Sequence, residues 1–157
     1  MEADGISNIY FDQLMKIISL SFRGKFSLDN ILTFEEETFS LIVNLSKVGE
    51  KGSHFIALFV LESKIWYFDS FGTLQINTII EKYLKKYRKT ILYTKTLIQH
   101  PLSSHCGFFC ISFILCLENK IPPKIFLKML HKDKLYINDY ICIAIINFYI
   151  KYMYLRK

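Results

Sequence analysis

The spacing of apolar residues along the chain predicts several helices. In the first of them, Leu14, Ile17 and Ile18 recur at helical spacing, and lysines lie off the apolar stripe of the second. The third is apolar on all sides, which is typical of a helix buried in a core. A Pro-Pro pair begins the fourth. The predicted helices cover residues 8–20, 77–88, 106–117, 122–131 and 136–154.

Runs of strand character lie between these helices. Two of them are almost wholly apolar and only two residues apart, so they predict a tight hairpin in a sheet covered on both faces. Residues 22–34, with Gly24 and an Asp-Asn pair, are expected to form a loop. The strands are expected at residues 39–45, 54–61, 64–69 and 90–98. This order predicts one α+β domain over residues 1–157, with a central mixed sheet flanked by helices.

Composition and charge narrow the class of protein. Hydrophobic residues make up 52% of the chain and charged residues 22%, which excludes a disordered protein. Residues 1–50 carry 4 Lys or Arg against 8 Asp or Glu, whereas residues 51–157 carry 16 against 6. The basic excess of the second part indicates an acidic partner such as nucleic acid, or it serves solubility, and composition leaves both interpretations open.

The cysteines indicate free thiols in a reducing, intracellular compartment. There is no Cys-x-x-Cys and the four His are scattered, so no metal site is predicted. Cys106 and Cys110 would lie one helical turn apart, too far for a disulfide. The first five residues are acidic and polar, unlike a secretory signal. The apolar run 107–117 is too short to cross a bilayer, so no membrane association is expected.

Cys106 has the sequence surroundings of a nucleophile. It begins the buried helix, and a helix N-terminus favours a thiolate and offers N–H donors to an oxyanion. His54 begins one strand of the hairpin and Asp69 ends the other, so antiparallel pairing brings them together. Gln99 can supply a second oxyanion donor, whereas His105, adjacent to Cys106, is a poor candidate for the base. Each residue alone has an ordinary structural explanation; together they predict thiol chemistry.

In this combination the sequence resembles the adenovirus-type maturation proteases (adenain), whose architecture the SUMO-specific proteases share. In that family a Gly-x-His-aromatic begins a strand and an acid followed by x-Phe-Gly ends the next. A Gln then precedes, by seven residues, a Cys-Gly-x-Phe-Cys helix start. The resemblance covers about residues 10–118. The matching residues are Gly52-Ser53-His54-Phe55, Asp69-Ser70-Phe71-Gly72, Gln99 and Cys106-Gly107-Phe108-Phe109-Cys110.

The resemblance implies a cysteine endopeptidase of papain-like or adenain-like architecture. Cys106 would be the nucleophile, His54 the general base, Asp69 the orienting carboxylate and Gln99 an oxyanion donor. The implied substrates are viral or virus-like-element precursor proteins cleaved during virion maturation, often near Gly, in the host nucleus or the virion. The chemistry needs no cofactor. Phe55 stands where the family usually has Trp, and Asp69 where adenovirus enzymes have Glu.

DNA and a viral peptide activate proteases of that family, and the resemblance raises the same expectation here. Residues 88–98 contain no Cys, so a peptide would add as a strand and not through a disulfide tether. A basic cluster interleaved with Tyr83 and Tyr87 predicts non-specific, salt-dependent DNA contacts. This cluster consists of Lys82, Lys85, Lys86, Arg88, Lys89 and Lys95.

Two other interpretations stay open. The same fold and triad would suit a protease of SUMO- or ubiquitin-like tails, or an acyltransferase. The chain could instead be a non-catalytic, basic nucleic-acid-binding module. The interval between Gln99 and Cys106 and the small size favour the maturation enzyme, and thiol reactivity at neutral pH would separate an enzyme from a binding module.

Overall fold

The computed structural model describes residues 8–51, 54–73 and 75–156. Within them the chain forms five strands, five α-helices and one short 3-10 helix. In chain order the elements are α1 (Asn8–Ile18), β1 (Phe22–Ser27), β2 (Phe39–Asn44), β3 (Phe55–Val60), β4 (Lys64–Phe68), α2 (Thr78–Lys85), β5 (Thr90–Tyr93), α3 (Cys106–Glu118), α4 (Pro123–Lys128), a 3-10 helix (Leu135–Ile137) and α5 (Asn138–Leu155).

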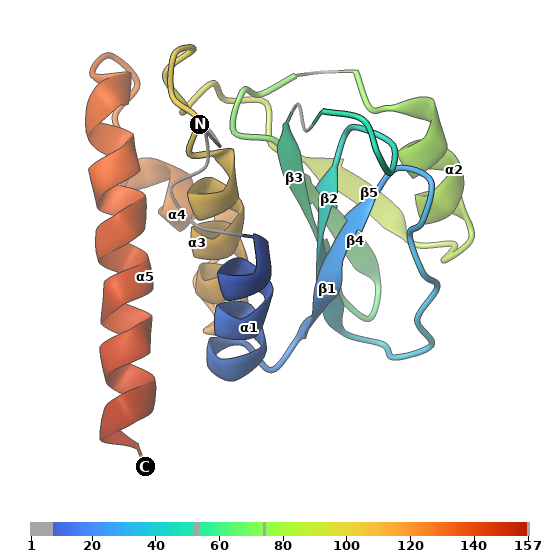
Figure 1. Cartoon of the computed structure of the whole chain (residues 1–157), viewed down its shortest axis with the longest axis horizontal. Helices are drawn as coiled ribbons and strands as arrows, with labels where there is room; N and C mark the ends of the chain where they lie inside the picture. Colours follow the sequence, from blue (N-terminus) through green and yellow to red (C-terminus); the bar gives the residue numbers. More distant parts are fainter. Residues whose placement is uncertain (1–7, 52–53, 74, 157) are drawn as a thin grey trace.

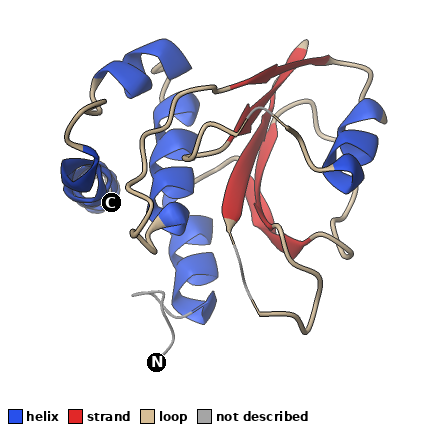
Figure 2. Cartoon of the chain, turned by 90° about the horizontal axis from the view of Figure 1, so that it is seen from above, coloured by secondary structure: helices blue, strands red, loops and turns tan. Residues whose placement is uncertain are grey.

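The elements form three layers around a mixed sheet. The strands lie in the order β1-β2-β3-β4-β5. In Figures 1 and 2, α1, α3, α4 and α5 lie on one side of the sheet and α2 lies on the other. The two central pairings, β2 with β3 and β3 with β4, are antiparallel, whereas each edge strand runs parallel to its neighbour. The predicted α+β class is confirmed.

The prediction of a loop over residues 22–34 is wrong for the first part of this segment. Phe22–Ser27 forms β1 and pairs with β2, with an irregular register between Phe22 and Gly24. Two basic residues and a Gly give this segment little strand propensity. The ladder of hydrogen bonds to β2 and the burial of Phe22 in the core, at 4% exposure, supply the stabilisation that propensity does not.

The strand expected over residues 90–98 is shorter than predicted. β5 ends at Tyr93, and the chain then leaves the sheet for the end of β4. There the main-chain N–H groups of Ile98 and Gln99 both donate to the carbonyl of Ser70, at 2.9 and 3.1 Å. These main-chain bonds bring residue 99 beside residue 70, and the segment after Tyr93 does not extend the sheet.

Both faces of the sheet are buried, as the apolar hairpin strands predicted. On one face, Phe68 stacks on Phe113 of α3 at 4.3 Å between ring centroids, and Phe126 of α4 packs edge-on against both. On the other face, Ile80 and Leu84 of α2 belong to a second buried cluster. Burial on two sides fixes the sheet, and with it α3, which is apolar almost throughout.

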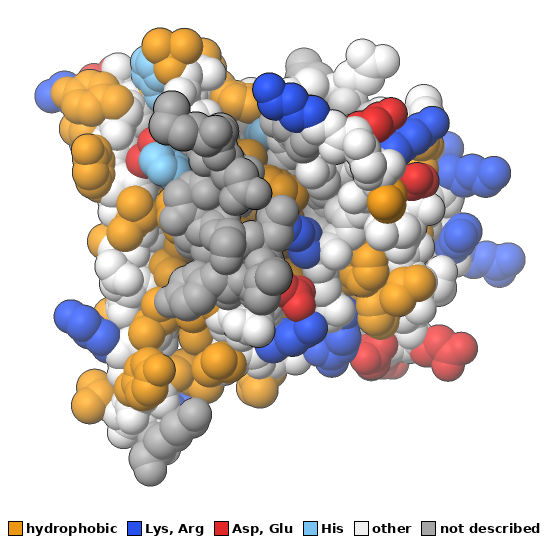
Figure 3. Space-filling view, in the orientation of Figure 1, with side chains coloured by type: hydrophobic (Ala, Val, Ile, Leu, Met, Phe, Trp, Pro, Cys, Tyr) orange, Lys and Arg blue, Asp and Glu red, His pale blue; other side chains and the backbone are white. Residues whose placement is uncertain are grey.

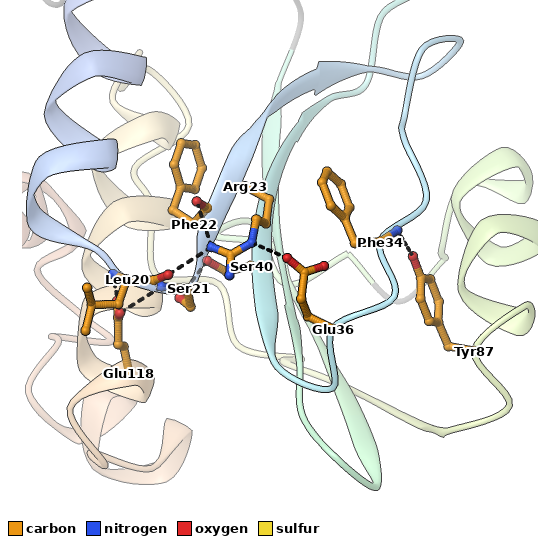
Figure 4. A network of polar contacts seen from close by, with 9 residues as sticks. All are labelled: Leu20, Ser21, Phe22, Arg23, Phe34, Glu36, Ser40, Tyr87 and Glu118. Atoms are coloured by element: carbon orange, nitrogen blue, oxygen red, sulfur yellow. Dashed lines mark hydrogen bonds and ion pairs between the residues drawn. The ribbon is translucent and has the colours of Figure 1, made fainter.

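The far end of α3 is tied to the connection between α1 and β1 by one carboxylate. Glu118 accepts hydrogen bonds from the hydroxyl of Ser19 at 2.6 Å and from the main-chain N–H groups of Leu20 and Ser21. Figure 4 shows Glu118 with Leu20 and Ser21, and the ion pair of Arg23 with Glu36 further along the same network. Glu118 thus locks the helix layer to the edge of the sheet.

None of the helices in the described ranges has the length and apolar character needed to cross a membrane.

We expect Glu118→Ala to lower the free energy of unfolding by about 2 kcal/mol, because three donors lose a charged acceptor. Glu118→Gln, which keeps one side-chain oxygen as an acceptor, should lose less than half of that. Urea denaturation of the two variants and the wild type measures the difference. Equal stability of wild type and Glu118→Ala would contradict the assigned role.

Candidate active site

The hairpin brings His54 and Asp69 together, as their positions at its two strand ends predicted. His54 immediately precedes β3 and Asp69 immediately follows β4, and the two strands pair antiparallel. Nε2 of His54 lies 2.7 Å from Oδ1 of Asp69, and the two side chains are 12% and 3% exposed. The Gly52-Ser53 turn that was predicted to precede His54 lies outside the described residues.

Asp69 is held by its own turn as well as by His54. Its Oδ1 also accepts a hydrogen bond from the N–H of Phe71 at 2.9 Å, and Thr73 contributes a side-chain hydrogen bond. Burial alone would raise the pKa of Asp69, but the bonds from His54 and Phe71 hold it below its usual value. The carboxylate is therefore ionised and fixed in direction at neutral pH.

Gly72 allows the chain to turn at this point. Its φ is +65°, and a Cβ built on it would lie 2.6 Å from the carbonyl carbon of Thr96 and 2.8 Å from the nitrogen of Leu97. The backbone that follows β5 thus passes directly against Gly72, where no side chain fits. This close approach explains the Gly of the acid-x-Phe-Gly pattern in physical terms.

His54 lies between the carboxylate and the thiol. Because Asp69 occupies Nε2, the other ring nitrogen, Nδ1, is left for Cys106, with which His54 also makes a side-chain hydrogen bond. Burial alone would lower the pKa of His54, but the bonds with Asp69 and Cys106 raise it to about 9. The ring of Phe71 stacks on the imidazole at 4.6 Å. At neutral pH a fixed imidazolium therefore faces the sulfur.

Cys106 is the first residue of α3 and is 7% exposed. His105, at the N-cap, makes no side-chain capping bond, so the N–H groups of the first turn are not capped by it. The other three thiols lie in different surroundings. Burial raises the pKa of Cys110 well above its usual value and that of Cys116 and Cys142 to about 12. Among the four, Cys106 alone lies beside an imidazolium.

Gln99 is held at both ends of its side-chain amide. The hydroxyl of Ser70 donates to Oε1 at 2.5 Å, and Nε2 donates to the carbonyl of Ser103 at 2.8 Å. One N–H of Nε2 is left to donate elsewhere. Gln99 is 1% exposed and Ser70 is fully buried. Sequence reasoning missed Ser70, although its place directly after Asp69 in the motif was the signal that could have found it.

His105 has a partner that sequence reasoning also missed. Its Nδ1 lies 2.9 Å from Oδ2 of Asp139 in the first turn of α5. Asp139 follows Cys106 by more than thirty residues, and no motif in the sequence links the two positions.

The six cations of the predicted basic cluster differ in their contacts and exposure. Lys and Arg side chains gather over α2 at the right of Figure 3. Lys85 pairs with Glu81 at 3.2 Å, and Lys89 donates to the carbonyls of Glu37 and Leu61. Lys82, Lys86, Arg88 and Lys95 are exposed. The hydroxyl of the interleaved Tyr83 is bound to Leu32 within the protein.

The described residues contain no group of three or more His, Cys, Asp or Glu side chains placed to hold a metal ion.

Comparisons with known proteins give a likeness of fold. No protein-family model and no curated protein matches the sequence. Among solved structures, the chain is similar to two crystal structures of the ASFV pS273R protease. The selenomethionine form has 19% identity and a TM-score of 0.47 over 63% of this chain and 41% of that one. The other has 20% identity and a TM-score of 0.44 over 63% and 40%. The match spans less than half of that protease.

The stability of the His54–Asp69 pair should depend on pH with a definite sign. The pKa of His54 is about 9 in the folded chain and ~6.5 when unfolded, so its stabilisation is complete below pH ~6.5 and is lost as pH rises through 9. We expect the free energy of unfolding of wild type relative to His54→Gln to fall by roughly 2 kcal/mol between pH ~6 and ~10, after allowance for partial exposure. Urea denaturation across this range measures it. A difference that does not change with pH would contradict the raised pKa, and substitution of the exposed His131 by Gln is the control.

Gly72→Ala should destabilise the protein by at least about 2 kcal/mol. The backbone at this position has a left-handed conformation that side chains disfavour, and the added Cβ would also collide with backbone atoms. Gly49→Ala is the matched control: its φ is +83°, but a Cβ there would meet nothing within 4 Å. We expect Gly49→Ala to cost about 1 kcal/mol. Thermal and urea denaturation compare the two. Equal losses would mean that the contact with Thr96 and Leu97 is unimportant.

Proposed function

We propose that the protein is a cysteine endopeptidase that uses Cys106, His54 and Asp69. One observation supports this above the others: His54 is hydrogen-bonded to a buried carboxylate and to the thiol at the start of a buried helix. A positive charge beside a sulfur favours the thiolate, which is the nucleophilic form. A structural role alone would not require a buried charged His in contact with a Cys.

In the proposed acylation step, the Cys106 sulfur attacks the carbonyl carbon of the scissile peptide bond. The C–S bond forms as the carbonyl π-electrons move to oxygen, giving a tetrahedral oxyanion. The N–H groups at the start of α3 and the remaining N–H of Gln99 would bind that oxygen. His54 then donates its proton to the leaving amine as the C–N bond breaks. The product is a thioester on Cys106, with a neutral imidazole beside it.

The second half of the proposed cycle uses the same groups. Neutral His54 accepts a proton from water, whose oxygen attacks the thioester carbonyl. The oxyanion forms again in the same place, the C–S bond breaks and the carboxylic acid product leaves, giving its remaining proton to the solvent. His54 ends protonated beside the thiolate, which restores the starting state. Asp69 stabilises the imidazolium at both ends of the cycle and fixes the ring so that Nδ1 faces the sulfur.

We propose precursor proteins cleaved near small residues, often Gly, as the substrates, in the maturation of a virus or a virus-like element. This is the finer part of the proposal and follows from the adenain-like motifs. A panel of reporters separates it from the alternatives on the same fold. Hydrolysis of SUMO or ubiquitin fusions would assign a deconjugating protease instead, and transfer of an acyl group to Lys or Ser would assign an acyltransferase.

We also propose non-specific DNA as a partner, through the exposed cations Lys82, Lys86, Arg88 and Lys95. Such contacts would weaken as salt concentration rises. A peptide that adds as a strand beside β5 is the second proposed activator, and the proposed site of action is the host nucleus or the virion. Reduced cysteines are consistent with that compartment.

Alkylation of Cys106 across pH tests the proposed chemistry directly. We expect iodoacetamide to modify wild-type Cys106 readily at pH ~6.5, because a positive charge beside a sulfur favours the nucleophilic thiolate. In His54→Gln the rate at pH ~6.5 should be at least about tenfold lower and should rise toward the ordinary thiol value near pH ~8.5. Mass spectrometry of the peptides locates the label.

The other cysteines provide an internal control, because burial suppresses their reactivity at these pH values. Cys106→Ser should abolish fast labelling and cleavage while leaving the fold intact. If Cys106 reacts no faster than the other three thiols in the presence and absence of DNA, the catalytic assignment is wrong and the nucleic-acid-binding module becomes the better interpretation.

A further inference from the structure

A second carboxylate–imidazole pair lies beside the start of α3. Oδ2 of Asp139 accepts a hydrogen bond from the hydroxyl of Ser103 at 2.8 Å and lies 2.9 Å from Nδ1 of His105. The side chains of Asp139 and His105 are 15% and 35% exposed. In Figure 1 the beginning of α5, which carries Asp139, lies beside the loop that leads into α3. The catalytic cycle proposed above assigns no role to this pair.

The hydrogen bonds of Asp139 are directed at the loop and not at its own helix. An Asp in the first turn of a helix commonly interacts with the N–H groups of that helix. Here two groups of the loop use Oδ2, while Oδ1 is buried and has no hydrogen-bond partner among the described residues. A buried carboxylate oxygen without a partner costs stability. The arrangement therefore favours a role in the loop over a role in stabilising α5.

Ser103 links Asp139 to Gln99. The Ser103 hydroxyl donates to Asp139, its oxygen accepts from the N–H of His105 at 3.2 Å, and its carbonyl accepts from Nε2 of Gln99 at 2.8 Å. Ser70 holds the opposite end of the same amide. With both ends held, the remaining N–H of Nε2 has one fixed direction. Release of Ser103 would leave the amide held at Oε1 alone, by Ser70.

The residue before Asp139 fastens the other end of the loop. Asn138 is fully buried, and its Nδ2 donates to the carbonyl of Ile98 at 2.7 Å and to the carbonyl of His131. Two successive residues of α5 thus hold this loop: Asn138 binds the backbone of Ile98, and Asp139 binds the side chain of Ser103. The first turn of α5 acts as a clamp on the segment that carries the oxyanion donor.

We propose that Asp139 is a positioning residue for acyl transfer at Cys106: it holds Ser103, and through Ser103 it holds the Gln99 side chain in the direction an oxyanion donor requires. This inference rests on the proposed function, and it assigns a role to a helix that the catalytic motifs do not include. Asp139 itself does not touch the reacting atoms.

Two reagents separate this role from the reactivity of the thiolate itself. Iodoacetamide alkylates Cys106 by displacement of iodide, and no oxyanion forms. p-Nitrophenyl acetate acylates Cys106: the sulfur adds to the carbonyl carbon, an oxyanion forms, and p-nitrophenolate leaves as the thioester is made. Only the second reaction needs a positioned oxyanion donor. The full chain is used, and the variants are Asp139→Ala, Asp139→Asn, Ser103→Ala and Gln99→Ala.

We expect Asp139→Ala and Ser103→Ala to acylate at least about tenfold more slowly than wild type, a partial loss of the ~100-fold that an oxyanion donor supplies. Alkylation should stay within about twofold. Asp139→Asn, whose amide oxygen can take the place of Oδ2, should retain most of the acylation rate. In the Gln99→Ala background, Asp139→Ala should cause no further decrease, because its effect passes through Gln99.

Glu118→Ala is the structural control, since Glu118 is also a carboxylate that holds a loop against α3, but at the opposite end of the helix. It should lower stability without changing the ratio of acylation to alkylation. Equal losses of both rates in Asp139→Ala, or an undiminished effect of Asp139→Ala in the Gln99→Ala background, would overturn the inference while leaving the protease assignment in place. Failure of wild-type Cys106 to react with either reagent would remove the proposed function and this inference with it.

Discussion

The hydrogen bond between His54 and Asp69 is the interaction on which the rest of the site depends. Asp69 is buried, and a buried carboxylate is costly unless it is paired. The pairing with His54 compensates that cost and leaves a positive charge on the imidazole at neutral pH. The second ring nitrogen is then available in one direction, toward Cys106. The electrostatic requirement of one residue thus determines the protonation state and the orientation of the next.

The same constraint shapes the backbone around the site. After Asp69, at the end of β4, the chain turns through Gly72, and that turn lets the segment after β5 pass against it. This approach places Gln99 beside Ser70, and the next residues lead to the start of α3. The buried sheet thus aligns His54 with Asp69, and a loop held against it carries Gln99 and leads to Cys106.

The site was more predictable from the sequence than some elements of the fold. The ends of an apolar hairpin lie together by topology, so His54 and Asp69 could be paired from their positions alone. β1 could not be predicted from the local sequence, because Phe22–Ser27 becomes a strand only by pairing with β2. Ser70 could have been predicted from the sequence, since it follows Asp69 directly. Asp139 could not, because its contact depends on how α5 packs, which local patterns do not encode.

Two His–carboxylate pairs lie near Cys106, and their surroundings differ. The His54–Asp69 pair is almost fully buried, and its second ring nitrogen faces the Cys106 thiol, as the proposed proton transfer requires. The pair formed by His105 and Asp139 is more exposed, and its carboxylate also accepts a hydrogen bond from the Ser103 hydroxyl, so it can hold the loop in place. Residue type alone does not distinguish the two pairs. What distinguishes them is which third group each one contacts.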